Sequence, residues 1–200
     1  MGKVVVMNHV TLDGVMQGPG RPDEDTRGGF SRGGWAVPHA DQATVQKMGE
    51  RMGPDHAFLF GRRTYGQLLE SWNTQGGPFK EALNNTPNYV ASGDPATRLR
   101  WPNSTLLQGD VPAAVKELRE TSPLNFVIMG SGVLIRSLMA AGQIDEYLLM
   151  IHPVVLGSGQ QLFAGGINAP LRLIEADHTA TGVLMAVYVP DREDTGKLNR

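Results

Sequence analysis

Short apolar runs alternate along the chain with segments of mixed polarity. A run rich in valine, leucine, isoleucine or phenylalanine predicts a buried strand, because a strand covered on both faces is apolar along its length. Such runs occupy residues 3–10, 56–60, 88–91, 105–108, 125–129 and 147–155. Buried parallel strands of this kind are typical of α/β proteins.

The segments between these runs have helical spacing. Val45, Met48 and Met52 lie on one stripe of a helix expected over residues 41–52. Further helices are expected from residue 62 to about residue 72, over residues 112–120 and over residues 133–141. Gly142 ends the last of these, since glycine is favoured just beyond a helix C-terminus.

The alternation of strands and helices ends near the C-terminus. Residues 171–178 and 183–189 read as two strands of a hairpin that turns at residues 179–182. We therefore predict an α/β fold of three layers, αβα, whose mixed sheet is mostly parallel and ends in an antiparallel C-terminal hairpin. One domain is expected over residues 1–190, followed by a polar tail at residues 191–200.

Charge and composition exclude several classes of binding partner. The net charge of −2 gives no positive field for nucleic acid or anionic lipid, and the chain has no cysteine for a disulfide or a thiolate metal site. The histidines show no i, i+3 or i, i+4 pairing, so no metal site is expected. No apolar stretch has the length of a membrane span, and residues 1–10 lack the features of a signal peptide. We expect a cytoplasmic protein, without membrane or nucleic-acid partners.

Two further features concern assembly and motion. The strand over residues 147–155 and the hairpin offer more apolar surface than one helical layer would cover, which predicts a homodimer. Residues 18–34 contain six glycines and form a long loop, and such loops often cover a binding site. Arg21, Arg27 and Arg32 in this loop are either ligand-binding cations or solubilising charges.

Two turns that follow strands are candidate anion sites. Gly130-Ser131-Gly132 presents unobstructed backbone N–H groups at a helix start, whose partial positive charge favours a pyrophosphate. Gly61-Arg62-Arg63-Thr64 presents two guanidinium groups, which pair well with phosphate. The alternative for the first turn is a tight turn without a ligand. For the second, the alternative is that the arginines cover apolar surface or pair with a residue such as Glu70.

The order of the motifs is more specific than any one of them. Over residues 3–190 the chain resembles the dihydrofolate-reductase-like superfamily, in particular the reductase domain of bacterial riboflavin biosynthesis. The motifs that carry the resemblance are TLDG at 11–14, FGRRTY at 60–65, YVAS at 89–92, MGSG at 129–132, IDEY at 144–147 and PVVLGSG at 153–159.

This resemblance implies NADPH as cofactor and a small-molecule substrate whose C=N or C=O carbon accepts hydride. It places the ribose phosphate of NADPH at residues 61–64, its adenosine half near Ser92 and its pyrophosphate at residues 130–133. The implied cofactor-binding residues are Gly61, Arg62, Arg63, Thr64, Ser92, Gly130, Ser131, Gly132 and Val133.

Two carboxylates are candidates for substrate binding or proton transfer. Asp13 follows the first strand, and Asp41 stands at the start of the first helix, a placement that resembles the acidic position of dihydrofolate reductases. The alternatives are a turn-forming role for Asp13 and a helix N-cap for Asp41. Three functions therefore stay open: a reductase, a nucleotide-binding protein without turnover, and a scaffold.

Overall fold

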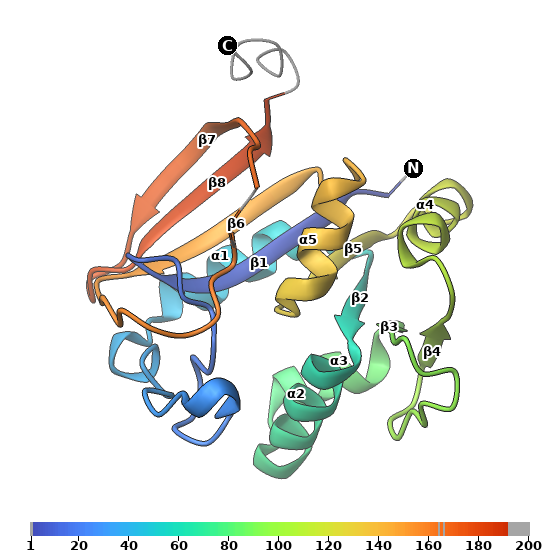
Figure 1. Cartoon of the computed structure of the whole chain (residues 1–200), viewed down its shortest axis with the longest axis horizontal. Helices are drawn as coiled ribbons and strands as arrows, with labels where there is room; N and C mark the ends of the chain where they lie inside the picture. The colour runs from blue at the N-terminus through green and yellow to red at the C-terminus, as the bar shows by residue number, and fades with distance from the viewer. Residues whose placement is uncertain (1, 164, 166, 192–200) are drawn as a thin grey trace. The chain divides into compact units, whose positions relative to one another are not determined.

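The computed structural model describes residues 2–163, 165 and 167–191. The strands join one eight-stranded sheet in the order β4-β3-β2-β5-β1-β6-β8-β7 (Figure 1). The strands are β1 (Val4–Thr11), β2 (His56–Gly61), β3 (Asn88–Ala91), β4 (Ser104–Leu107), β5 (Asn125–Ile128), β6 (Glu146–His152), β7 (Leu171–His178) and β8 (Leu184–Pro190). The helices are α1 (Gln42–Met52), α2 (Arg62–Gln75), α3 (Pro78–Asn85), α4 (Val111–Thr121) and α5 (Gly132–Ala140), with short 3-10 turns η1 (Arg27–Gly29) and η2 (Val37–His39).

The chain divides into two compact units. The first contains Met1–Val5 and Met52–Gln143, and the second contains Val6–Arg51 and Ile144–Arg200. No helix in the described part of the chain is long and apolar enough to cross a membrane. The two sets of candidate residues fall in different units, so each set is built from its own unit below.

The first unit confirms the predicted parallel strands. β2 pairs in parallel with β3 on one side and with β5 on the other, and β3 pairs in parallel with β4. The fully buried rings of Phe58 and Phe60 stack along β2, with centroids 5.5 Å apart. Tyr65 and Leu69 are the buried residues of α2.

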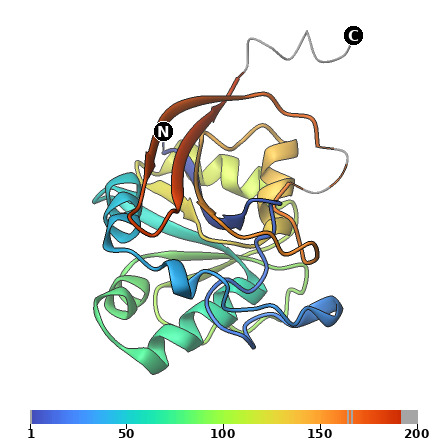
Figure 2. The same cartoon turned by 90° about the vertical axis from the view of Figure 1, so that its left-hand side faces the viewer.

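The second unit confirms the predicted hairpin. β8 pairs antiparallel with both β6 and β7 (Figure 2). A register shift in the β7–β8 pairing lies between Leu173 and Glu175. β7 stands at the edge of the sheet and leaves Leu173 and Ile174 about half exposed, at 50% and 44%. These exposed side chains suit the predicted homodimer, which stays a prediction.

One α-helix was not predicted, and two element ends differ by about three residues from those expected, whereas the other ends differ by one residue at most. Helix α3 was not predicted. In the structure Pro78 opens this helix, at a position where the missing N–H of proline costs nothing. Phe79 then packs edge-on against Trp72, at 4.9 Å between centroids, and α2 extends to Gln75 instead of ending near residue 72. Strand β6 ends at His152 instead of residue 155, because the Val154 N–H turns back to the His152 carbonyl at 2.7 Å.

Candidate functional site

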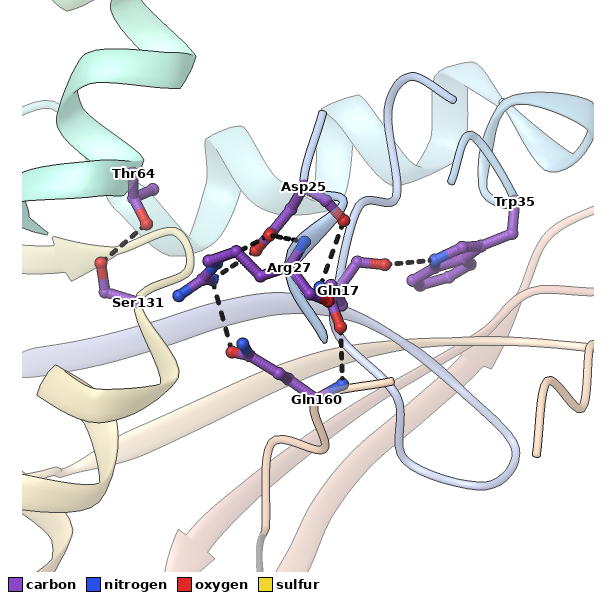
Figure 3. Close-up of polar contacts among 7 residues, drawn as sticks. All are labelled: Gln17, Asp25, Arg27, Trp35, Thr64, Ser131 and Gln160. Carbon is purple, nitrogen blue, oxygen red and sulfur yellow. Dashed lines mark hydrogen bonds and ion pairs between the residues drawn. The ribbon is translucent and has the colours of Figure 1, made fainter. Parts of the chain in front are cut away.

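In the first unit, Ser131 joins the two predicted anion-binding turns. Its hydroxyl accepts a 2.9 Å hydrogen bond from the Gly61 N–H and donates a 2.7 Å bond to Thr64 Oγ1 (Figure 3). A Cβ atom on Gly61 would collide with this hydroxyl, so only glycine allows the close approach. The sequence predicted both turns, and the structure brings them into direct contact.

The backbone at the second turn is unusual. Ser131 has φ 73°, a left-handed conformation that non-glycine residues rarely adopt, and Gly130 before it has φ 89°. Such strained residues persist where surrounding contacts fix them, and they cluster at ligand sites. Ser131 is the N-cap of α5, whose first-turn N–H groups have no acceptor within the helix and favour an anion.

Three predicted segments meet at one edge of the first unit. β2 and β3 align Gly61 with Ala91, and β2 also runs parallel to β5, so all three strands end at the same side. The hydroxyl of Ser92, the residue after β3, forms a 2.7 Å hydrogen bond with Thr97 Oγ1 and accepts another from the Asp94 N–H. Ser92 therefore shapes the loop beyond β3.

Arg62 and Arg63 are both exposed at the start of α2. Neither forms an ion pair among the residues that the structure describes, so the alternative of a pair with Glu70 is not seen there. Two uncompensated guanidinium groups beside a helix start favour a phosphate.

In the second unit, Asp13 anchors a loop. Its carboxylate accepts hydrogen bonds from Thr11 Oγ1 at 2.5 Å, from the Gly157 N–H at 2.7 Å and from the Leu156 N–H at 3.2 Å. The bond from Thr11, followed by the bond from Gly157, lowers the pKa of Asp13. Asp13 is therefore held as an ionised acceptor that fastens the turn at residues 156–157.

Asp41 caps helix α1. Its Oδ1 accepts a 2.9 Å hydrogen bond from the Ala43 N–H, the geometry of an N-cap aspartate. The second carboxylate oxygen, Oδ2, takes no part in this cap, and the side chain is half-buried. The helix-cap interpretation is thus present in the structure, and it leaves one oxygen for another partner.

The glycine-rich loop is organised around Gln17, which is 4% exposed. Its side chain donates to the carbonyls of Asp25 and Arg27 and accepts from the Gln160 N–H at 2.9 Å (Figure 3). Its carbonyl accepts a 2.7 Å bond from the Trp35 indole N–H. Phe30 and Trp35 pack with Val15 beneath the loop, which gives this segment a small core of its own.

The three arginines of this loop all have partners, two of them within the loop. Arg21 pairs with Asp23, Arg27 pairs with Asp25, and Arg32 donates to the Leu156 carbonyl at 2.9 Å. They stabilise the loop and do not gather into one basic cluster.

A cluster of three histidines was not predicted. His9 of β1, His39 of η2 and His152 of β6 come together, with the rings of His9 and His39 at 5.1 and 5.7 Å from the His152 ring. Their distances along the chain hide this contact from any search for short spacings. The signal that could have found it is the position of His9 and His152 near the carboxyl ends of two apolar strands.

Comparison with known proteins now identifies the family. The profile of the RibD C-terminal domain matches residues 2–186. The chain belongs to this family. Among its relatives, the uncharacterised protein YyaP of Bacillus subtilis (strain 168) is 23% identical over 203 residues, covering 93% of this chain and 94% of YyaP.

Solved structures agree with the fold of this RibD C-terminal domain. A pyrimidine reductase-like protein from Corynebacterium diphtheriae has a TM-score of 0.66 at 13% identity, covering 96% of this chain and 93% of its own. Dihydrofolate reductase from Enterococcus faecalis, solved with NADP(H) and RAB-propyl, has a TM-score of 0.64 at 11% identity, covering 95% and 97%. The dihydrofolate-reductase-like fold predicted from the sequence is confirmed.

Proposed function

We propose that this protein is an NADPH-dependent reductase that reduces a C=N or C=O group of a small pterin-like, pyrimidine or related substrate. The observation that carries the proposal is the contact of Ser131 with Gly61 and Thr64, which joins a helix N-terminus to the start of the Arg62-Arg63 helix. Membership in a family of reductase domains and a fold shared with a reductase solved with NADP(H) support it.

The first unit would hold the cofactor. Arg62 and Arg63 would pair with the phosphate on the adenosine ribose, and the first turn of α5, at Gly132 and Val133, would receive the pyrophosphate. Gly130 and Ser131 would shape this turn, and the loop fixed by Ser92 would lie at the adenosine half. When bound, the reduced nicotinamide supplies hydride.

The second unit would serve the substrate. Asp41 has a carboxylate oxygen beyond the one used in its helix cap, so it is the better candidate for a hydrogen bond to substrate N–H groups. Asp13, with its carboxylate engaged by Thr11, Leu156 and Gly157, would act through the loop that it fastens.

Titration of the protein with NADPH and NADH, followed through tryptophan fluorescence, tests the proposal. One charge-assisted hydrogen bond contributes roughly 1.5 to 3 kcal/mol, so NADPH should bind at least about tenfold more tightly. NADPH oxidation is then measured with dihydrofolate and dihydropterin as acceptors. Equal affinities would refute the phosphate site, tight NADPH binding without oxidation would favour a binding protein, and no binding would favour a scaffold.

A further inference from the structure

Strand β7 of the second unit is an open edge of the sheet (Figure 1). In the described part of the chain only β8 pairs with it, so the backbone groups on its other side have no strand partner. Proteins usually protect such an edge with proline, with lysine or by keeping the strand short. β7 has eight residues, LRLIEADH, without proline or lysine, whereas β4 at the other edge has four. Of the two edges, β7 is therefore the one suited to accept a further strand.

The side chains of β7 are exposed along most of the strand. Leu173 and Ile174 in its middle are 50% and 44% exposed. Arg172 before them and Asp177 after them are exposed as well, and neither forms an ion pair with any residue that the structure describes. His178, the last residue of the strand, is also exposed. The edge thus carries an unpaired cation, an apolar pair and an unpaired anion, in that order.

The register shift in β7 puts both of these charges on one face of the sheet. Arg172 and Asp177 are five positions apart, but the register skips Ile174, so their partners on β8 are four positions apart. Because side chains alternate along β8 and directly opposite residues share a face, Arg172 and Asp177 point to the same side of the sheet. Glu175 points there too, since its β8 partner lies midway between theirs. The ion pairs of Glu175 with two basic residues of α1 identify this side as the face that α1 covers.

Arg172 and Asp177 are too far apart to pair with each other. Their β8 partners lie four residues apart, which is about 13 Å at the usual rise of a strand. A second copy of β7, laid antiparallel along the open edge about a twofold axis between residues 174 and 175, would place Arg172 opposite Asp177 of the partner subunit. By the same symmetry, Asp177 would lie opposite the partner's Arg172. Since directly opposite residues share a face, both ion pairs would form on the face that α1 covers.

We propose that β7 is a homodimer interface, in which two copies of the chain join their β7 strands antiparallel about this axis and extend the sheet from one subunit into the other. A second copy fits the edge because the strand is complementary to itself. Opposite charges meet on both sides of the axis, and Leu173 meets the partner's Ala176 on the face away from α1. The interface goes beyond the proposed reductase activity and does not depend on it.

Charge reversal, in single variants and in their mixture, tests the interface. In sedimentation equilibrium at micromolar concentration, the wild type should have the mass of two 21.6 kDa chains. Arg172→Asp and Asp177→Arg each replace two attractive pairs by two repulsive ones, so each should raise the Kd of the dimer at least about tenfold. An equimolar mixture of the two variants should form heterodimers as tight as the wild-type dimer, because opposite charges then face each other again. Lys116→Asp, which makes the same change of charge at an exposed position of α4, is the matched control and should keep the wild-type Kd.

Amide hydrogen exchange tests whether the two strands pair through their backbones. In the wild-type dimer, the β7 amides that point away from β8 should be protected by the partner strand. In Arg172→Asp, at a concentration where this variant is monomeric, the same amides should exchange at least about tenfold faster. The amides of β4, at the other edge of the sheet, should exchange equally in both proteins. Equal exchange of the β7 amides in dimer and monomer would overturn the strand pairing.

Three results of the sedimentation experiment would overturn the interface. The first is a wild type that stays monomeric, and the second is single variants that dimerise as tightly as the wild type, which would place the dimer contact elsewhere. The third is a mixture that remains as weak as its two components, because the charges would then not face each other across a twofold axis. Recovery of the dimer in the mixture also shows that both variants are folded. NADPH binding, measured separately by the nucleotide titration, decides the proposed function and not this interface.

Discussion

The backbone N–H of Gly61 and the hydroxyl of Ser131 form a 2.9 Å hydrogen bond across 70 residues of sequence. This bond places the end of β2 directly against the start of α5, and it leaves no space for a side chain on Gly61. The two turns thus depend on each other, and a substitution in one turn should change the affinity for a ligand bound at the other.

Gly61→Ala should therefore be destabilising and should also weaken NADPH binding. The added methyl group meets Ser131 Oγ and Cβ, and overpacking of this kind costs about 1 to 3 kcal/mol of unfolding free energy. Gly66→Ala in the middle of α2 is the matched control: its Cβ meets nothing within 4 Å, and alanine favours a helix by about 1 kcal/mol. Urea denaturation and NADPH titration measure both. Equal stability changes in the two variants would contradict the close contact.

The sequence predicted these two turns because glycine and arginine follow recognisable strands. It also located every strand, and the ends of β3 and β7 agree with the predicted ones. It could not predict that Ser131 adopts a left-handed conformation, since serine does so only when neighbouring contacts impose it. The histidine cluster was missed for a related reason: His9, His39 and His152 are joined by tertiary packing alone.

Asp41 provides a way to separate a helix cap from a substrate contact. Asparagine caps helices about as well as aspartate, so Asp41→Asn should change the unfolding free energy by less than about 0.5 kcal/mol, whereas Asp41→Ala should cost about 1 kcal/mol. If the carboxylate binds substrate, Asp41→Asn should still lower kcat/KM at least about tenfold, with NADPH affinity unchanged. Asp110→Asn, at the N-cap of α4 with a 3.1 Å bond from Ala113 N–H, is the control. Full activity in Asp41→Asn would leave Asp41 as a cap only.

The buried histidines make stability depend on pH. In the unfolded chain a histidine titrates near pH 6.5, whereas the pKa of His152 in the fold is about 4, so only the unfolded state takes up a proton between these values. The unfolding free energy should thus fall from pH 6.5 to pH 4, by about 3 kcal/mol for this one residue. Urea denaturation midpoints measured between pH 6.5 and pH 4 report this loss of unfolding free energy. The fall should shrink in His152→Asn and persist in His178→Asn; the same fall in both variants would show that other groups cause it.

Gln17 should control the motion of residues 18–34. Gln17→Ala removes a buried side chain that bonds Asp25, Arg27 and Gln160, and should raise amide exchange throughout the loop. In the wild type we expect faster exchange in this loop than in the strands, and slower exchange once NADP⁺ and dihydropterin are bound. The exposed Gln46→Ala on α1, which loses only a contact with Glu50, is the control. Slow exchange in the wild-type loop, the same with and without ligand, would remove the idea of a lid.

Arg62 and Arg63 should set the preference for NADPH over NADH. NADPH differs by one phosphate, and both guanidinium groups are exposed without an ion-pair partner in the described residues. Arg62→Ala and Arg63→Ala should each weaken NADPH binding, by about tenfold or more where the arginine faces the phosphate, and change NADH binding little. Because neighbouring residues at a helix start point in different directions, we expect the two substitutions to have unequal effects on NADPH affinity.

Added salt should reduce the difference in affinity between NADPH and NADH, since an exposed ion pair is screened. Lys116→Ala, which removes an exposed charge on α4, controls for net charge. Parallel losses of NADPH and NADH affinity in both arginine variants would assign these side chains to a part of the nucleotide other than the distinguishing phosphate.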